Sequence, residues 1–176
     1  MYKQRGSALV IGLILIVGLM FIGVSAVQNA NVNYRASSNF NNVQISFQSA
    51  ESALVQGEAL LSGANVKLNY CNGKNITNCI WPSEKFSNEN FISGSAWSSA
   101  QNASKNISSS SGAPLYIIQE QDFQAFELSP DSQSKGLGMY YYRVTAKGYG
   151  SKPHNEAASK NEASQTIVES IFAKSY

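Results

Sequence analysis

Few side chains in this 176-residue chain are of types that carry out catalysis or bind metal ions. The chain has one histidine, His154, and its carboxylates gather most closely at Glu120, Asp122 and Glu127. A carboxylate pair can hydrolyse a glycosidic bond, but the chain has no G-x-S-x-G, H-E-x-x-H or phosphate-binding loop motif. We therefore expect a protein that is not an enzyme and that has no cofactor and no metal site.

The two cysteines, Cys71 and Cys79, stand close together in the sequence. In an oxidising compartment, such a pair is most simply a disulfide, which would stabilise the fold by about 2–3 kcal/mol on the chain-entropy model. A zinc site would need further ligands, and the single histidine lies far along the chain. We expect a Cys71–Cys79 disulfide.

A short basic segment, Met1-Tyr-Lys-Gln-Arg-Gly6, stands directly before an uncharged apolar run from Ser7 to Val27. A secretory signal peptide is cut after its apolar region, which is then lost. Here the glycine that follows the basic residues comes before the apolar region, so a cut after Gly6 would leave that region on the mature protein. The alternative is an ordinary signal anchor that keeps residues 1–6.

The apolar run is long enough to cross a membrane. Its 21 residues form about 31 Å of helix, which matches the hydrocarbon core of a bilayer. Lys3 and Arg5 precede the run and the next charge is Arg35, so residues 1–6 are expected in the cytoplasm and the chain after about residue 28 outside. No basic stripe occurs, and we expect no direct contact with nucleic acid.

The helix is expected to continue beyond the membrane, from Ser7 to Ser62, because no proline occurs before Pro82. Its second half is predicted to be amphipathic, with one face packed on a domain. That face carries Val32, Ala36, Phe40, Val43, Phe47, Ala50, Leu54 and Leu61. Gly12, Gly18 and Gly23 favour either close packing of neighbouring helices or local melting of the helix.

Two segments resemble the PilX-like minor pilins of type IV pili. Gln4-Arg5-Gly6-Ser7-Ala8-Leu9 is similar to their Q-R-G-x-A-L junction, and Phe47-Gln-Ser-Ala-Glu-Ser-Ala-Leu54 is similar to their F-Q-x-A-E-x-A-L segment. The resemblance covers about the first 60 residues. Glu51 and Glu58, seven residues apart, share a helix face. We expect them to be solvated or to pair with the head domain, with a contact to a neighbouring pilin as the alternative.

The resemblance implies that prepilin peptidase cuts between Gly6 and Ser7 and methylates the new amine of Ser7. It also implies that the helix packs on other helices, first in the membrane and then in the filament, through Ala8, Ile11, Gly12 and Gly18. The implied partners are other minor pilins, the major pilin, the inner-membrane assembly machinery and a large tip adhesin. The chain would cross the inner membrane once, with its head in the periplasm, and would then enter the pilus at the cell surface.

One residue departs from the pilin pattern. Most type IV pilins carry Glu at the fifth residue after the cleavage glycine, where it is taken to pair with the N-terminal amine of the adjacent subunit. Here that residue is Ile11. The minor pseudopilin K of type II secretion, which is placed at the tip, also lacks this Glu. The departure therefore favours a tip or initiation position, with a subunit that never polymerises as the competing explanation.

The remainder of the chain predicts a mixed head domain. Residues 63–113 read as a polar stretch with short elements, in which Trp81 and Trp97 either anchor the stretch to the helix or form a binding patch. Strands are predicted at Leu115–Gln121, Phe123–Leu128, Met139–Tyr149 and Gln165–Ala173. Arg143 and Lys147 are candidate partners of Glu169, but the sequence does not fix the register that would bring them together.

The expected fold class is α+β, pilin-like, with a long N-terminal helix packed on an antiparallel sheet of three or four strands. The expected divisions are a leader (1–6), a transmembrane half-helix (7–27), an amphipathic half-helix (28–62) and a periplasmic head (63–176).

Together these features predict a minor pilin that helps to initiate or cap the assembly of a type IV pilus, in a complex with other minor pilins at its tip. Adhesion and twitching motility are downstream uses of such a filament. Two alternatives are a minor pseudopilin of a type II secretion system and a signal-anchored periplasmic binding protein that enters no filament.

Overall fold

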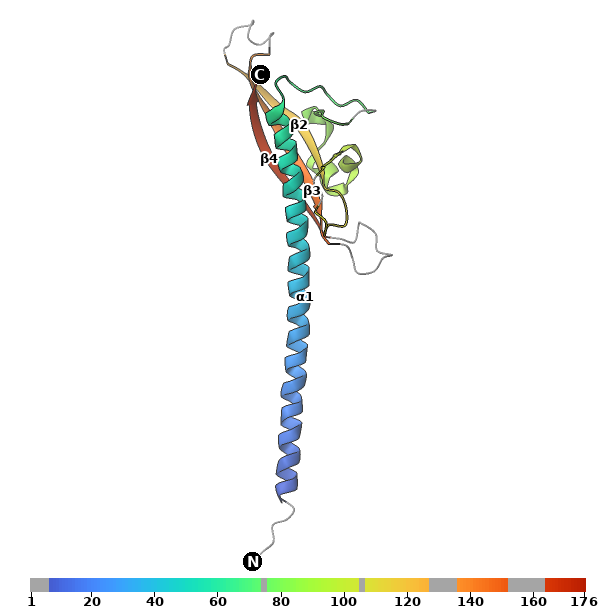
Figure 1. Ribbon diagram of the computed structural model, residues 1–176, viewed down its shortest axis with the longest axis vertical. Helices are drawn as coiled ribbons and strands as arrows, with labels where there is room; N and C mark the ends of the chain where they lie inside the picture. Colours follow the sequence, from blue (N-terminus) through green and yellow to red (C-terminus); the bar gives the residue numbers. More distant parts are fainter. Residues whose placement is uncertain (1–6, 74–75, 105–106, 127–135, 152–163) are drawn as a thin grey trace, which may run out of the picture. The chain divides into compact units, whose positions relative to one another are not determined.

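A computed structural model of the chain describes residues 7–73, 76–104, 107–126, 136–151 and 164–176. It divides into two compact units, one up to Asn41 and one from Asn42 onward. The boundary lies within a single helix, α1, which runs from Ser7 to Gly63 (Figure 1). The predicted uninterrupted helix is therefore confirmed, and it ends one residue later than expected.

The first unit consists of the N-terminal part of α1. Its large apolar side chains are exposed on all sides of the helix, from Leu9 at 74 % to Val27 at 62 %. The helix is long and apolar enough to cross a membrane. Exposed apolar surface on this scale is unfavourable in water, so this segment requires lipid or other protein around it.

The second unit contains a four-stranded antiparallel sheet in the order β1-β2-β3-β4. The strands are Gln101–Asn102 (β1), Leu115–Ala125 (β2), Gly138–Tyr149 (β3) and Gln165–Ser175 (β4). The sheet and α1 together confirm the predicted α+β arrangement. The prediction of two strands at Leu115–Gln121 and Phe123–Leu128 was wrong, because the pairing with β3 continues past a register shift between Glu120 and Asp122. Such a bulge bends a strand without ending it; Leu128 lies outside the described residues.

One face of the sheet packs on the head-proximal part of α1. Tyr116 and Ile118 of β2 and Tyr142, Val144 and Ala146 of β3 form a buried cluster with the helix. The helix contributes Ala53, Leu54 and Leu61 to this cluster, and its neighbouring Ser46, Ser49 and Ala50 are also buried. Most of these side chains are small, so the helix backbone lies close to the strands.

The predicted apolar stripe of the helix was therefore only partly correct. Ala50, Leu54 and Leu61 are buried, but Val43 and Phe47 remain exposed, at 53 % and 49 %. The buried face is centred instead on small residues such as Ser46 and Ala50. A stripe chosen by hydrophobicity misses this face because close backbone packing selects for small size rather than for apolar area.

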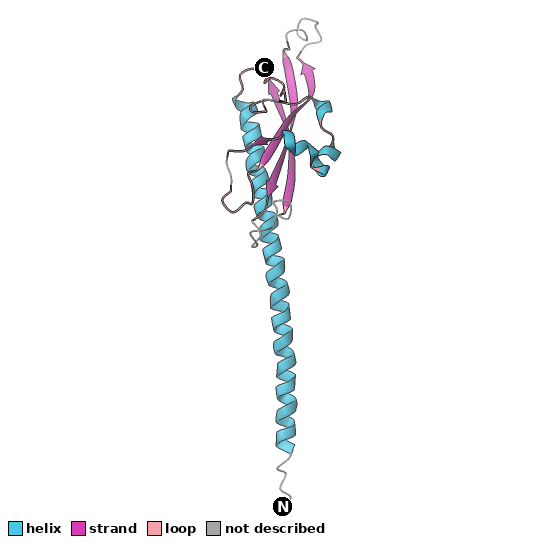
Figure 2. Cartoon of the chain, turned by 90° about the vertical axis from the view of Figure 1, so that its right-hand side faces the viewer, coloured by secondary structure: helices cyan, strands magenta, loops and turns pink. Residues whose placement is uncertain are grey.

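The opposite face of the sheet carries a second cluster, formed by residues 81–100 (Figure 2). This lobe contains two short 3₁₀ helices, Ser83–Lys85 (η1) and Ser95–Ser99 (η2), and one α-helix, Asn88–Ser93 (α2). Its aromatic rings follow one another in edge-on or tilted contacts through Trp81, Phe86, Phe91 and Trp97. The cluster packs on Ile117 of β2, so these tryptophans anchor the lobe to the sheet and not to α1.

Gln119 of β2 and Arg143 of β3 hold the lobe to the sheet by hydrogen bonds to its main chain. The fully buried amide of Gln119 donates through Nε2 to the carbonyl oxygens of Ser83 (3.2 Å) and Phe86 (3.2 Å). Arg143 Nη2 in turn donates to Gln119 Oε1 at 2.7 Å. Arg143 also donates to Phe86 O (3.3 Å) and Asn88 Oδ1 (3.4 Å) of the lobe. Glu169 lies opposite Thr145 in the β3–β4 register, and its candidate ion pair with Arg143 or Lys147 is absent among the described residues.

Candidate functional site

The apolar N-terminal part of α1 is a long surface that the described residues leave uncovered. A Cβ added at Gly12, Gly18 or Gly23 would meet no atom within 4 Å, so no contact in the described part of the chain explains these glycines. Ile11 is 58 % exposed. The junction residue Gly6 lies outside the described residues, whereas Ser7 and Ala8 are the first two residues of α1.

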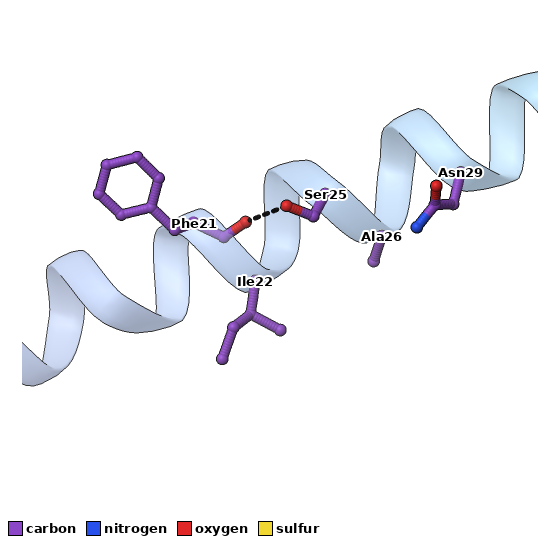
Figure 3. Close-up of a pocket in the computed structure, with 5 residues that line it drawn as sticks. All are labelled: Phe21, Ile22, Ser25, Ala26 and Asn29. Carbon is purple, nitrogen blue, oxygen red and sulfur yellow. Dashed lines mark hydrogen bonds between the residues drawn. The ribbon is translucent and has the colours of Figure 1, made fainter.

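A shallow hollow lies on this helix between Phe21 and Asn29, where the small residues Ser25 and Ala26 leave room (Figure 3). The Ser25 hydroxyl donates to the carbonyl oxygen of Phe21 at 2.9 Å, one helical turn earlier. A hydroxyl satisfied in this way can face lipid or another apolar helix without an unpaired donor. The hollow is thus suited to receive a side chain from a neighbouring helix. Sequence reasoning based on glycine missed it, although a serine next to an alanine was a usable signal.

The segment Phe47–Leu54 lies where α1 meets the sheet. Ala50 and Ala53 are fully buried there, and a Cβ on Gly57 would approach Val144 Cγ1 at 2.7 Å. Glu58 accepts a hydrogen bond from Ser170 Oγ of β4 at 2.7 Å, which confirms the expected pairing with the head. The small residues of this motif therefore serve close packing of helix and sheet.

The predicted disulfide between Cys71 and Cys79 is present. Main-chain bonds flank it, from Cys71 N to Ile80 O (2.8 Å) and from Ile80 N to Asn69 O (3.1 Å). The buried Gln101 side chain donates to Cys79 O at 2.9 Å and accepts from Asn78 N at 2.9 Å. The loop is therefore held by the covalent bond and by the first residue of β1, which fixes it to the sheet.

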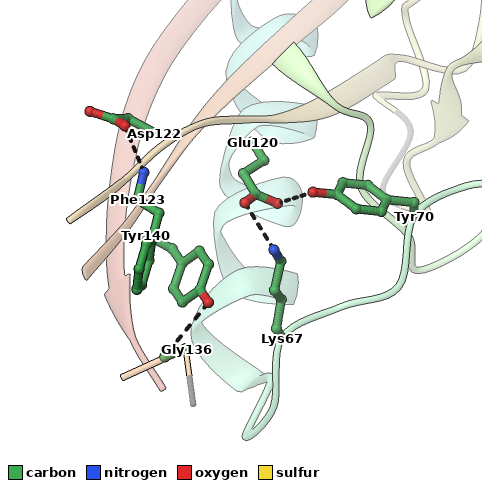
Figure 4. Close-up of polar contacts among 7 residues, drawn as sticks. All are labelled: Lys67, Tyr70, Glu120, Asp122, Phe123, Gly136 and Tyr140. Carbon is green, nitrogen blue, oxygen red and sulfur yellow. Dashed lines mark hydrogen bonds and ion pairs between the residues drawn. The ribbon is translucent and has the colours of Figure 1, made fainter. Parts of the chain in front are cut away.

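Two of the carboxylates considered for catalysis, Glu120 and Asp122, make separate structural contacts. Glu120 accepts from Lys67 Nζ at 2.9 Å and from Tyr70 Oη at 2.8 Å, whereas Asp122 accepts from the neighbouring Phe123 N at 2.8 Å (Figure 4). Glu127 and His154 lie outside the described residues. Within the described ranges, no group of three or more His, Cys, Asp or Glu side chains is placed to hold a metal ion.

Burial and the contact with Glu120 also shift the pKa values of Lys67 and Tyr70. Burial by itself lowers the pKa of the Lys67 ammonium, but the hydrogen bond and negative charge of Glu120 outweigh it and raise the pKa above its usual value. Burial, together with the hydrogen bond to Glu120, raises the pKa of the Tyr70 hydroxyl. Lys67 Nζ also lies 4.7 Å from the centroid of the Tyr140 ring. The contacts of Glu120 thus brace the segment after α1 against β2.

A comparison with protein families identifies the head. The family model described as "Type IV pilus assembly protein PilX C-term" matches residues 62–174, which is more than half of the 176-residue chain. The chain belongs to the PilX family. No curated protein and no solved structure matches it. PilX proteins are type IV pilus assembly proteins, so the chain takes part in the assembly of type IV pili.

The family match begins where the resemblance of the first 60 or so residues ends. The helix with its junction and the head therefore point to the same family independently. The exposed apolar helix of this PilX protein fits anchoring in a membrane. The braced loop, the lobe and the sheet form its head.

Proposed function

We propose that this PilX protein is a minor pilin that helps to initiate or cap pilus assembly, in a complex with other minor pilins at the pilus tip. Its role is structural and not catalytic. The observation that supports this proposal best is the apolar part of α1, whose large side chains from Leu9 to Val27 are exposed on all sides. A cut between Gly6 and Ser7 by prepilin peptidase would keep that surface on the mature protein.

The energetics of this proposal depend on packing. When the helix leaves the membrane for a filament, it exchanges lipid contacts for helix contacts, so hydrophobic burial alone contributes little. Close approach at the small residues must supply the preference. We propose that neighbouring helices pack at Ala8, Ile11, Gly12 and Gly18. The open space around both glycines agrees with this proposal.

Ile11 is the reason for placing the subunit at the tip. A carboxylate in a membrane is costly unless it is paired, and a subunit with no neighbour above it has no amine to pair with. Partners proposed on this basis are the other minor pilins, the major pilin, the inner-membrane assembly machinery and a large tip adhesin. The proposed route runs from the inner membrane, with the head in the periplasm, to the pilus at the cell surface.

The proposal is tested by complementation of a strain that lacks this protein, with surface pili counted by electron microscopy. Wild type and the leader control Tyr2→Ala should restore pili and release the leader. Gly6→Leu should leave the leader uncut, keep the protein in the membrane and restore few pili. Normal numbers of pili in a strain whose Gly6→Leu protein remains uncut would contradict the proposal.

A further inference from the structure

The sheet has two margins, and the described residues cover only one of them. Beyond β2, Trp81 N donates to Ile118 O and Glu120 N donates to Trp81 O, both at 2.8 Å. The short strand β1 pairs with Leu115 and Tyr116 on the same side. The main-chain groups along that margin are therefore largely satisfied within the chain.

The other margin is β4, which pairs with β3 from Gln165 to Ser175 and has no strand on its other side among the described residues (Figure 1). An edge strand leaves the N–H and C=O groups of alternate residues unpaired, and proteins usually protect it with proline, a bulge or lysine. β4 has no proline, and its pairing with β3 has no register shift. Its one lysine, Lys174, donates to Leu61 O (2.8 Å) and Ser62 O (2.6 Å) of α1 and does not guard the edge.

The outer face of β4 adds a chemical pattern to this free edge. Ile167 and Ile171 are 42 % and 62 % exposed, and Glu169 lies between them on the same face. Among the described residues, neither neighbouring cation neutralises Glu169. Arg143 Nη2 donates to Gln119 Oε1 at 2.7 Å, and Lys147 Nζ lies 5.4 Å from the centroid of the Trp97 ring.

A groove runs beside this face, between β4 and helix α2. It is lined by Asn88, Phe91, Ile92, Thr145, Ile167 and Glu169. Ile92 is 83 % exposed, whereas the Thr145 hydroxyl is buried and has no hydrogen-bond partner in the described part of the chain. An unpaired buried hydroxyl and an exposed isoleucine are each unfavourable, and both line the groove beside Ile167 and Glu169 of β4.

We propose that the free edge of β4 binds an extended strand from another subunit of the pilus assembly. Main-chain hydrogen bonds to the edge would supply affinity, and side chains at alternate positions would supply specificity. The matching strand carries Lys or Arg opposite Glu169 and apolar side chains opposite Ile167 and Ile171. Because that pattern is symmetric about Glu169, it serves a parallel or an antiparallel strand. The inference rests on the proposed function only in naming the partner as a pilus subunit.

A second copy of this chain fits the edge less well. If two β4 strands paired antiparallel about Glu169, the two Glu169 carboxylates would lie opposite each other, and like charges in that position are destabilising. A strand with a cation at this position converts the same contact into an attraction. Charge thus favours a different subunit over a copy.

The test uses the full-length protein in detergent micelles and short fluorescent peptides, with binding measured by anisotropy. One peptide alternates Thr and Val around a central Lys, and its twin has Glu at the centre. The Lys peptide should bind wild type about fivefold more tightly than its twin, from the difference between opposite and like charges across strands. Glu169→Lys should invert this preference and Glu169→Gln should remove it.

Two further peptides separate strand addition from other binding. A Lys peptide methylated on its backbone nitrogens cannot donate main-chain hydrogen bonds and should bind at least tenfold more weakly, as expected if several such bonds are lost. Equal binding of the Lys and Glu peptides, unchanged preference in Glu169→Lys, or undiminished binding of the methylated peptide would overturn the proposal. Tighter binding of a peptide copy of β4 would overturn it in favour of self-association. None of these results depends on pilus formation, so the inference can fail while the proposed function stands.

Discussion

Gly148 of β3 carries no side chain, and the packing leaves no room for one. An added Cβ would contact Ala50 N and Ser46 O, which are backbone atoms of α1 that cannot rotate away. Helix and strand therefore touch through their main chains. This contact explains why the helix face is made of Ser46, Ser49 and Ala50, a face that a hydrophobicity pattern could not reveal.

Gly148→Ala should lower the thermal midpoint of the head. Forcing a methyl group against backbone costs about 1–3 kcal/mol, typical of overpacked interiors. The matched control is Gly73→Ala, where an added Cβ meets nothing within 4 Å and the shift should be near zero. Circular dichroism of both variants in detergent measures the difference, and equal shifts would show that the helix–strand contact is looser than described.

At the scale of elements, the sequence predicted best where one rule dominates. The absence of proline before Pro82 predicted the end of α1 to within one residue. The alternation of Tyr140, Tyr142 and Val144 with the residues between them predicted β3. The lobe of residues 81–100 was read only as loops with short elements. Its order comes from long-range contacts such as Gln119 with Ser83 and Phe86, which have no local signature.

The polar contact of Gln119 should be essential to the lobe. Gln119→Ala would remove the donor to the carbonyl oxygens of Ser83 and Phe86 and the 2.7 Å acceptor of Arg143, although Arg143 would keep its longer bond to Phe86 O. Loss of such bonds costs about 1–3 kcal/mol. We expect an earlier change in tryptophan fluorescence on heating, whereas the exposed control Gln124→Ala should behave as wild type. An unchanged transition in Gln119→Ala would contradict the assigned role.

The sheet and its neighbouring segments should lose stability at alkaline pH. Burial raises the pKa of the Tyr70, Tyr116, Tyr142 and Tyr149 hydroxyls, so the folded state keeps protons that the unfolded state releases. The stabilisation is thus fully present below the ordinary tyrosine pKa of about 10 and is lost as pH rises through the folded values. Lys67 has the same sign, since its pKa is also raised.

Lys147 opposes this trend, because burial lowers the pKa of its ammonium group. Burying the charged form costs free energy, and this cost disappears as the group loses its proton at higher pH. The tyrosines and Lys67 outnumber it, so the thermal midpoint should fall as the pH rises above about 10. Glu120→Gln removes the negative charge that raises the Lys67 pKa and should flatten part of the fall. A midpoint that stays constant or rises over this range would contradict the described burial of these side chains.

At the scale of the whole molecule, the chain combines two units with different requirements. The N-terminal part of α1 exposes apolar side chains and needs surrounding lipid or protein, whereas the head buries its own core on both faces of one sheet. The PilX family match covers the head, and the junction at Gly6 concerns the helix. The proposed subunit, first anchored in the membrane and then assembled into the pilus, would account for both.

The most direct test of this account is the N-terminal residue of the protein recovered from membranes and from sheared pili, determined by mass spectrometry. The account predicts a first peptide that starts at N-methylated Ser7 in both fractions. A peptide that starts at Met1, found only in membranes, would contradict it. The helix would then be an ordinary signal anchor, and the chain would support pilus assembly without entering the filament.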